Sequence, residues 1–299
     1  MKSAGAERRR IGGTAVSGLL IYLVLIFIAL AMVLPFIHEL AKSFSYPSEV
    51  DAGRVSLWPR KATLGNYYYY YRKHLIPLSR SFGITIYITG FGTLWSIYMT
   101  ALMAYPLSRS KREFRLGPFA MGIAIFSIIM FPPIIPYFLA IRSYGLMDTL
   151  WSIILTHTVV PFHLILLVTF FRQLPEDLFD SCRIDGGSDW RIFFQIVLPL
   201  SKAALATVAI FTAIILWNIF LHPLLFINNP KKFPLQIFLR SIFQEGGADP
   251  EVLLQRDPFD NTESIKSALV ILTILPIVLI YPLLQKHFIK GIMLGALKE

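Results

Sequence analysis

Six long stretches of the 299-residue chain contain no Asp, Glu, Lys or Arg. They run over Ile11–Ile37, Ser81–Ser108, Leu116–Ile141, Thr149–Phe171, Ala203–Pro230 and Ser267–Gln285. A helix needs about 20 apolar residues to cross the hydrocarbon core of a bilayer. Because lipid offers no water to open backbone groups, each stretch is expected to form a helix. The chain is therefore predicted to be an all-α polytopic membrane protein with one domain over residues 1–299. The expected spans are 14–37, 82–107, 117–141, 149–171, 203–227 and 266–285.

The composition points to the same class. Charged residues make up 15% of the chain and hydrophobic residues 55%, whereas soluble domains have about 25% charged residues. This excludes a soluble enzyme or a nucleic-acid module, and the net charge of +10 is expected to lie beside a membrane. The first stretch exceeds the roughly 7–15 apolar residues of a signal peptide, so it is expected to be retained. The single cysteine, Cys182, excludes a disulfide framework within the chain and a cysteine-based metal site.

The distribution of Lys and Arg predicts the orientation. Residues 109–115 carry four Lys and Arg side chains, whereas the equally short loop 142–148 carries one. Short cytoplasmic loops are enriched in these residues, so 109–115 is expected inside and 142–148 outside. Both termini and the long loop 172–202 then lie in the cytoplasm, and the loops 38–80 and 231–266 lie outside.

The loop 172–202 is predicted to begin with a short helix. Pro175 suits a first helical turn, and two acidic residues follow it, where the helix dipole favours negative charge. Leu174, Leu178 and Cys182 recur at four-residue spacing and are expected to form one weakly apolar face.

A glycine corner and a second helix are expected next. Gly186 and Gly187 stop the first helix, as glycine does at a left-handed cap, and Ser188 is suited to cap the second. The second helix is expected to end at Leu198-Pro199. Its apolar face takes the positions i, i+3, i+4 and i+7, which are Trp190, Phe193, Phe194 and Val197. Two short helices joined by a rigid corner suit docking to a partner protein. An amphipathic linker lying on the bilayer would explain the apolar faces but would not require the corner.

Residues 180–200 resemble the EAA loop of ABC-importer permeases, whose pattern is E-A-A-x-x-D-G-A followed further on by L-P. Asp180-Ser181-Cys182 stands in the place of E-A-A, Asp185-Gly186-Gly187 in that of D-G-A, and Leu198-Pro199 in that of L-P. The acid at the first position is shortened and both alanines after it are replaced, so this part of the motif departs from the family pattern.

The resemblance extends over nearly the whole chain. It is closest to the smaller, six-span subunit of the maltose-type carbohydrate permeases. The segments that carry it are Asn66-Tyr67, Ala104–Arg109, Gly145–Trp151, Trp217-Asn218, Pro223-Leu224 and Gly291–Lys298. In addition, Asn228–Leu235 resembles a branch that handles acidic or complex polysaccharide fragments, including alginate and pectin oligosaccharides.

The resemblance implies the type I ABC-importer permease fold and a place in the cytoplasmic (inner) membrane of a bacterium. The chain would form a translocation path with a homologous permease, as a heterodimer. It would receive oligo- or polysaccharides from an extracytoplasmic solute-binding protein and couple to two ATPase subunits through residues 174–199. Those subunits would bind ATP and Mg²⁺, because the chain has no G-x-x-x-x-G-K-[ST] loop. The chain itself is therefore expected to be neither an enzyme nor a protein that binds a cofactor or metal.

The resemblance also assigns residues to sites. Coupling to the ATPases would involve Asp180, Arg183, Asp185, Gly186, Gly187 and Trp190. The translocation path would include Trp217, Asn218 and His222, and an interhelical hydrogen bond is an equal alternative for Asn218. The C-terminal tail would contact the ATPases through Lys290, Gly295 and Lys298, and a frayed terminus is the alternative there.

Two other classes of protein compete with this interpretation. A membrane hydrolase would need a nucleophile and base or metal ligands, and the chain has neither H-E-x-x-H nor G-x-S-x-G. His157 and His163 are six residues apart, about 240° around a helix, so they are expected to be hydrogen-bonded structural residues. A secondary, ion-coupled transporter typically has ionisable residues in its spans and internal repeats. The charge-free stretches argue against this class, which stays the alternative.

Prolines within the stretches are expected to kink or break their helices, because proline lacks the N–H group and its ring clashes with the preceding turn. They are Pro132, Pro133 and Pro136 in the third stretch and Pro276 and Pro282 in the sixth.

Overall fold

The computed structural model describes residues 4–69, 71–72, 75–130, 133–244, 263–276 and 278–279. Over this part of the chain the structure consists of helices and turns without β-strands, which confirms the all-α prediction. The chain divides into two compact units. Unit 1 comprises residues 1–74 and 242–275, and unit 2 comprises residues 75–241 and 276–299.

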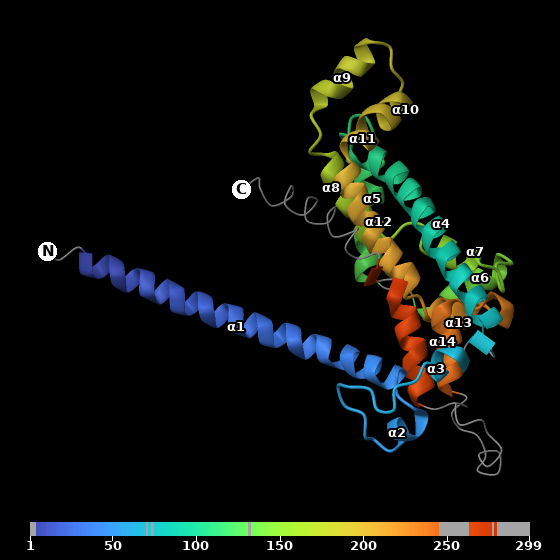
Figure 1. Ribbon diagram of the computed structural model, residues 1–299. Helices are drawn as coiled ribbons and strands as arrows, with labels where there is room; N and C mark the ends of the chain where they lie inside the picture. Colours follow the sequence, from blue (N-terminus) through green and yellow to red (C-terminus); the bar gives the residue numbers. More distant parts are fainter. Residues whose placement is uncertain are drawn as a thin grey trace. The chain divides into compact units, whose positions relative to one another are not determined.

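Unit 1 is dominated by one uninterrupted helix. α1 (Ala4–Ser43) has 40 residues and is therefore about 60 Å long (Figure 1). From Gly18 to Leu40 none of its residues is buried, and burial begins in the last turn, at Ala41 and Ser43. This surface is available to lipid or to another subunit. The same unit contains α2 (Pro47–Asp51), α3 (Gly65–Tyr69) and most of a helix over residues 263–276.

Polar side chains hold unit 1 together where α1 ends. The fully buried Asn66 donates hydrogen bonds from Nδ2 to the carbonyl oxygens of Ser43 and Ser45, at 2.7 and 2.9 Å. Its Oδ1 accepts a hydrogen bond of 3.2 Å from Ser264 Oγ. Glu49 is also buried, and it pairs with Lys61 at 2.6 Å. The loop that follows α1 is thus fixed by side chains far apart in the sequence.

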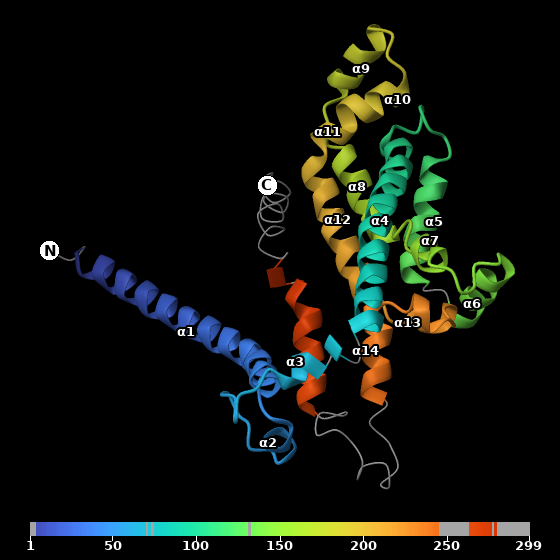
Figure 2. The same ribbon diagram turned by 45° about the vertical axis from the view of Figure 1, so that its right-hand side comes forward.

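Unit 2 is built around α4 (Leu75–Ser108), a helix of 34 residues. α8 (Pro161–Phe171) and α12 (Lys202–Trp217) pack along it, and α5 (Gly117–Ile129) packs on α4 and α8 (Figure 2). Small residues allow this close approach, as is common between membrane helices. At Gly92, for example, an added Cβ would lie 2.7 Å from Leu216 Cδ1 of α12.

Three of the charge-free stretches are broken, so the expectation of one helix for each stretch is wrong there. The third stretch forms α5 and α6 (Ile134–Ser143), and the fourth forms α7 (Trp151–Thr156) and α8. The fifth forms α12 and α13 (Leu221–Phe226). Pro133 directly precedes α6 and Pro161 opens α8, so the proline rule explains two of the breaks. The sequence interpretation named the first of these prolines and missed the second.

The span boundaries remain predictions. Within the described residues, Gly18–Ser43 and Pro77–Ser108 are the helices that are each long and apolar enough to cross a membrane. A further pair, Asp189–Leu200 with Lys202–Trp217, passes only as one span bent by 78°. The sixth span is described over residues 263–276 and 278–279, and all of these residues, Pro276 included, are helical. Pro282 and Pro132 lie outside the described residues, so the kinks predicted there stay predictions.

Candidate functional site

The 172–202 loop forms the two helices and the glycine corner that the sequence predicts. α9 (Glu176–Ile184) begins after Pro175, and α10 (Asp189–Ile192) begins after Ser188. Between them Gly186 takes a φ of +76°, in the left-handed region that favours glycine. Backbone hydrogen bonds close the corner, from Gly186 N to Arg183 O at 3.0 Å and from Gly187 N to Cys182 O at 2.8 Å. Ser188 Oγ accepts a hydrogen bond of 3.4 Å from Arg191 N, as expected of a cap.

Gly187 is required for a different reason from Gly186. A Cβ added at Gly187 would meet Cys182 Sγ and would lie 2.8 Å from the carbonyl oxygen of Cys182. At Gly186 an added Cβ would meet nothing within 4 Å. One glycine therefore supplies a backbone conformation, and the other supplies room for the Cys182 side chain.

The second helix does not end at Leu198-Pro199, as the sequence predicts, but continues to Leu200. α10 is followed by a π-helical turn, η2 (Phe193–Val197), and by α11 (Leu198–Leu200). Because Pro199 has no N–H to give to the preceding turn, the wider turn just before it lets the chain stay helical. The bend of 78° occurs after Leu200 and leads into α12.

The apolar faces of both helices also differ from the prediction. In α9 the buried side chain is Phe179, whereas Leu178 is 41% exposed. In the second helix Phe193 and Val197 are buried as predicted, but Trp190 and Phe194 are 59% and 47% exposed. The π-helical turn adds a residue to one turn and rotates the following residues, so the i, i+3, i+4 pattern no longer describes one face.

The buried side chains anchor the loop to the helices of unit 2. Phe179, Ile192, Phe193 and Val197 are each at most 2% exposed. They belong to one cluster with residues of α4, α8 and α12, which include Ala104, Leu107, Leu167, Phe171 and Val208. The loop is therefore continuous with the helix core rather than a flexible linker lying on its surface.

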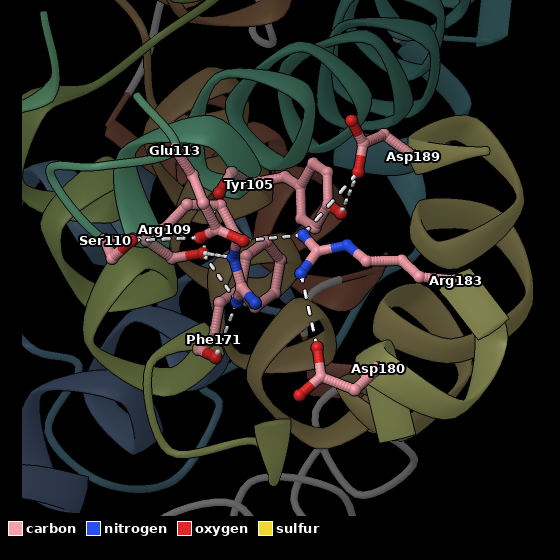
Figure 3. A network of polar contacts seen from close by, with 9 residues as sticks. Tyr105, Arg109, Ser110, Glu113, Phe171, Asp180, Arg183 and Asp189 are labelled. Atoms are coloured by element: carbon pink, nitrogen blue, oxygen red, sulfur yellow. Dashed lines mark hydrogen bonds and ion pairs between the residues drawn. The ribbon is translucent and has the colours of Figure 1, made fainter. Parts of the chain in front are cut away.

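A network of ion pairs and hydrogen bonds connects the same loop to the loop 109–115 (Figure 3). Arg183 Nη2 donates a hydrogen bond of 2.7 Å to Glu113 Oε1, on the neighbouring loop 109–115. The same guanidinium lies 3.5 Å from Asp180 Oδ1 and 3.9 Å from Asp189 Oδ1. Ser110 donates to Glu113 Oε2 from its backbone N and from Oγ, at 3.2 and 3.3 Å. Arg183 thus ties the first helix of the loop to the second and to the loop 109–115.

The network shifts the pKa values of its two central groups. Partial burial acts to raise the pKa of Glu113, but the hydrogen bonds from Arg183 and Ser110 outweigh it and hold the pKa below its usual value. The hydrogen bond to Glu113 raises the pKa of Arg183. Both groups are therefore charged throughout the physiological pH range.

A second arginine, Arg109, fastens the end of α4 to the loop. Its guanidinium lies 4.3 Å from the centre of the Phe179 ring and 5.2 Å from that of Tyr105. It donates hydrogen bonds to Ser108 Oγ, at 3.0 Å from Nη2, and to the carbonyl oxygen of Phe171, at 3.3 Å. Arg109 therefore bridges α4, α8 and α9.

The structure brings together some of the residues predicted to couple, and other side chains join them in the same network. Asp180 and Arg183 are ion-paired, Asp185 follows the last turn of α9, and Trp190 is exposed beside Phe194, with the two rings 6.1 Å apart. The sequence interpretation missed Glu113, Asp189 and Arg109. Glu113 is the one acidic residue in the basic loop 109–115, and this unusual position could have marked it as the partner of a basic side chain.

The predicted path residues lie at the break between α12 and α13. Trp217 is buried at the end of α12, and Asn218 Nδ2 donates to the carbonyl oxygen of Ile214 at 2.9 Å. That bond goes to the last turn of the preceding helix, and the choice between a path contact and an interhelical hydrogen bond for Asn218 stays a prediction. The ring of His222 in α13 lies 4.9 Å from that of His157, a contact that the sequence interpretation missed.

His157 and His163 are hydrogen-bonded, as predicted. His157 Nδ1 lies 3.0 Å from the carbonyl oxygen of Ile153, and His163 Nδ1 lies 3.2 Å from Thr212 Oγ1. The described residues contain no group of three or more His, Cys, Asp and Glu side chains that could hold a metal ion. Lys290, Gly295 and Lys298 lie outside the described residues, so the contact predicted for the C-terminal tail stays a prediction.

Apolar helices, several of them broken, and a rigid helical loop anchored at one end define the class of an integral membrane permease. Residues 97–293 match the family of binding-protein-dependent transport system inner membrane components, and the chain belongs to this family. Its helices have the type I permease fold of ABC importers.

Several relatives are similar over nearly their whole length. Protein LplC of Bacillus subtilis (strain 168) is 38% identical over 268 residues, which cover 89% of each chain. The polygalacturonan/rhamnogalacturonan transport system permease protein YtcP of the same strain is also 38% identical, over 94% of this chain and 97% of that protein. A crystal structure of a bacterial ABC transporter involved in the import of the acidic polysaccharide alginate contains a chain that matches with a TM-score of 0.84 and 27% identity. The match covers 92% of this chain and 98% of that one.

Proposed function

We propose that the chain is a permease subunit of an ATP-driven importer of oligosaccharides derived from acidic polysaccharides such as pectin. Two relatives support this substrate class, because one is a polygalacturonan/rhamnogalacturonan permease and one belongs to an alginate importer. The resemblance of Asn228–Leu235 to that branch points the same way. The family and these relatives give no support to an ion-coupled secondary transporter.

The 172–202 loop is the proposed docking element for an ATPase subunit. The observation that carries this role is the combination of a buried anchor and an exposed tip. Phe179 and Phe193 are buried in the helix core, whereas Ile184 at the corner is 85% exposed and Trp190 is 59% exposed. A partner that binds the exposed tip would move the helices of unit 2 with it. The buried anchor and the Arg183 network connect the loop rigidly to those helices.

The remaining partners follow from the family. We propose a homologous permease subunit as the heterodimeric partner, two ATPase subunits that bind ATP and Mg²⁺ and hydrolyse the nucleotide, and an extracytoplasmic solute-binding protein. In this arrangement both termini and the loop 172–202 face the cytoplasm. The C-terminal residues Lys290, Gly295 and Lys298 would contact the ATPases.

Reconstitution tests the proposed function. The complex of this chain with its partner permease and ATPases, placed in lipid vesicles with the binding protein, should take up trigalacturonate and hydrolyse ATP faster when it is present. Maltotriose, a neutral trisaccharide, is the matched control and should stimulate neither. ATP-independent uptake that follows a proton or sodium gradient would contradict the proposal and restore the secondary transporter.

A further inference from the structure

Three broken helices meet in unit 2, at the opposite end of α4 from the α9–α10 corner. The parts that meet are the start of α6, the end of α7 and the start of α13, and Figures 1 and 2 both show these elements gathered together. Tyr137 Oη donates a hydrogen bond of 3.4 Å to the carbonyl oxygen of Thr156. The His222 ring lies 5.3 Å from the Tyr137 ring and 4.9 Å from the His157 ring. We call this meeting point of Tyr137, His157 and His222 the break junction.

The break junction is polar although its residues come from charge-free stretches. Tyr137, His157 and His222 lie in the third, fourth and fifth stretches, respectively. Interrupted backbone within a bilayer is tolerated where it is covered by protein or lines a water-filled cavity. Polar side chains in such stretches usually face the bundle interior or a passage for substrate. The three breaks and the three polar rings coincide, which packing of apolar helices alone does not require.

The side chains of the break junction have donor and acceptor atoms that form no hydrogen bond within the described residues. His157 uses Nδ1 for contacts with Ile153 O and Thr156 Oγ1, which leaves Nε2. Tyr137 donates its hydroxyl proton and keeps its lone pairs. The half-buried His222 has ring contacts but no side-chain hydrogen bond within the described residues. Trp217, directly before the break, is buried, and its Nε1–H has no hydrogen-bond partner there. A buried donor without a partner, such as the Trp217 Nε1–H, costs about 1–3 kcal/mol, so a partner in another state would account for it.

The orientation of His222 is set by apolar packing. Its ring stacks on Phe226, with centroids 5.5 Å apart and planes 4° apart. Phe226 is fully buried, and its carbonyl oxygen accepts a hydrogen bond of 2.7 Å from Asp148 N. The junction therefore holds half-buried aromatic rings in fixed positions beside unused donors and acceptors. This combination suits a pyranose ring, which has an apolar C–H face and hydroxyl groups around its rim.

We propose that the break junction is a saccharide contact site of the permease itself. This inference rests on the proposed function, because it assumes an oligosaccharide as the transported substrate. The site would bind ring faces and hydroxyl groups rather than carboxylates, since the three stretches that build it contain no Lys or Arg. Recognition of the acidic groups would then lie elsewhere in the transporter.

His222→Phe and His222→Gln separate the two properties of the site. Phenylalanine keeps a ring that can stack on Phe226 but removes both nitrogens, whereas glutamine keeps a donor and an acceptor. We measure trigalacturonate taken up per ATP hydrolysed by the reconstituted complex, together with its thermal stability. His222→Phe should lower the uptake per ATP about tenfold, the effect of roughly one lost hydrogen bond, while His222→Gln should stay within about threefold of wild type.

His163→Phe is the matched control, because His163 is a buried histidine that bonds to Thr212 away from the break junction. It should lower the thermal stability and leave the uptake per ATP unchanged. Uptake per ATP at the wild-type level in His222→Phe would overturn the inference. So would equal losses in both His222 variants together with a lower thermal stability, which would show a structural role. Failure of the wild-type complex to take up trigalacturonate would overturn the proposed function and this inference with it.

Discussion

At each end of unit 2 one charged residue makes several polar contacts, but the two residues have different kinds of partner. At the α9–α10 end, Arg183 binds Glu113, Asp180 and Asp189, which are side chains on three separate segments. At the α6–α13 end, Asp148 binds backbone instead. Its Oδ1 accepts from Asn228 N and Asn229 N at 3.1 and 3.0 Å. Asp148 also pairs with Lys232 at 3.2 Å, through Oδ2.

The different partners reflect how the two ends are stabilised. The 172–202 loop is anchored by buried aromatic side chains, so its ion pairs add alignment between elements that are already packed. Residues 227–229, directly after α13, form no regular helix, and the Asp148 carboxylate satisfies backbone N–H groups that a helix would otherwise use. Asp148 has a φ of +56°, an uncommon conformation for a residue other than glycine, which these hydrogen bonds hold in place. Four changes test this contrast.

The largest effect is expected at the anchor. Phe179→Ala removes a buried ring from the core and the surface on which Arg109 lies, so it should destabilise the protein by about 3–5 kcal/mol. Leu178→Ala, on the exposed side of the same helix, is the control and should cost less than about 1 kcal/mol. Thermal unfolding in detergent micelles measures both. Equal losses would show that the loop is not anchored through Phe179.

A smaller effect is expected at the glycine corner. Gly187→Ala places a methyl group against Cys182, so it should destabilise the protein by about 1–3 kcal/mol. Cys182→Ala removes the obstructing sulfur and should recover part of this loss in the double variant. A double-mutant cycle on unfolding measures the coupling. Strictly additive losses would refute the account that the two side chains compete for one space.

The ion pairs should contribute less to stability than either packing change. Arg183→Ala should cost about 0.2–1 kcal/mol, because its partners are partly exposed and water screens them. The coupling of Arg183 to Glu113 should exceed its coupling to Asp180, since the first contact is shorter. Double-mutant cycles with Glu113→Ala and Asp180→Ala measure the two coupling energies. Stronger coupling of Arg183 to Asp180 than to Glu113 would contradict the geometry.

The smallest effect is expected at Asp148 and depends on pH. Hydrogen bonds from Asn229 N, Lys232 and Asn228 N lower the pKa of the Asp148 carboxyl group against the opposing effect of desolvation. A lowered pKa in the folded state adds stability above the ordinary value of about 4, and this stability is lost as the pH falls through the lowered pKa. Asp148→Asn should therefore unfold at a lower temperature than wild type at pH 7, and the gap should narrow below about pH 4. A gap that stays constant between pH 7 and pH 3 would show that the charge of Asp148 is not involved.

The sequence predicts the 172–202 loop well where local chemistry decides the structure. Pro175, Gly186 and Ser188 act through their own backbone and caps, and each does what its residue type indicates. The apolar faces were predicted only in part: Phe193 and Val197 are buried as expected, whereas Trp190 and Phe194 are exposed. In α9 Phe179 is buried in place of Leu178, and it packs against Arg109, 70 residues earlier in the chain. Contacts between distant segments, such as Arg183 with Glu113 or His222 with His157, leave no periodic signal in a single sequence.

The broken stretches illustrate the same limit. Apolar composition alone predicted one helix for each of these three stretches. The prolines of the third stretch indicated a break there, whereas Pro161 was not recognised as the start of a second helix in the fourth. The break before α13 has no proline at its first residue, and tertiary contacts of His222 and Phe226 accompany it. Composition thus identifies which stretches are apolar, whereas prolines and long-range packing determine where the helices stop.

Cross-linking tests the central claim, that the tip of the 172–202 loop docks on an ATPase subunit. In a Cys182→Ala background, which is free of other cysteines, Ile184→Cys places a thiol at the exposed corner. Trp58→Cys, at a side chain that is 82% exposed in the predicted outer loop 38–80, is the matched control. A short thiol-reactive photo-cross-linker in the assembled complex should join the ATPase subunit to residue 184 and not to residue 58. Adducts of residue 58 alone, in a complex that hydrolyses ATP, would contradict the account.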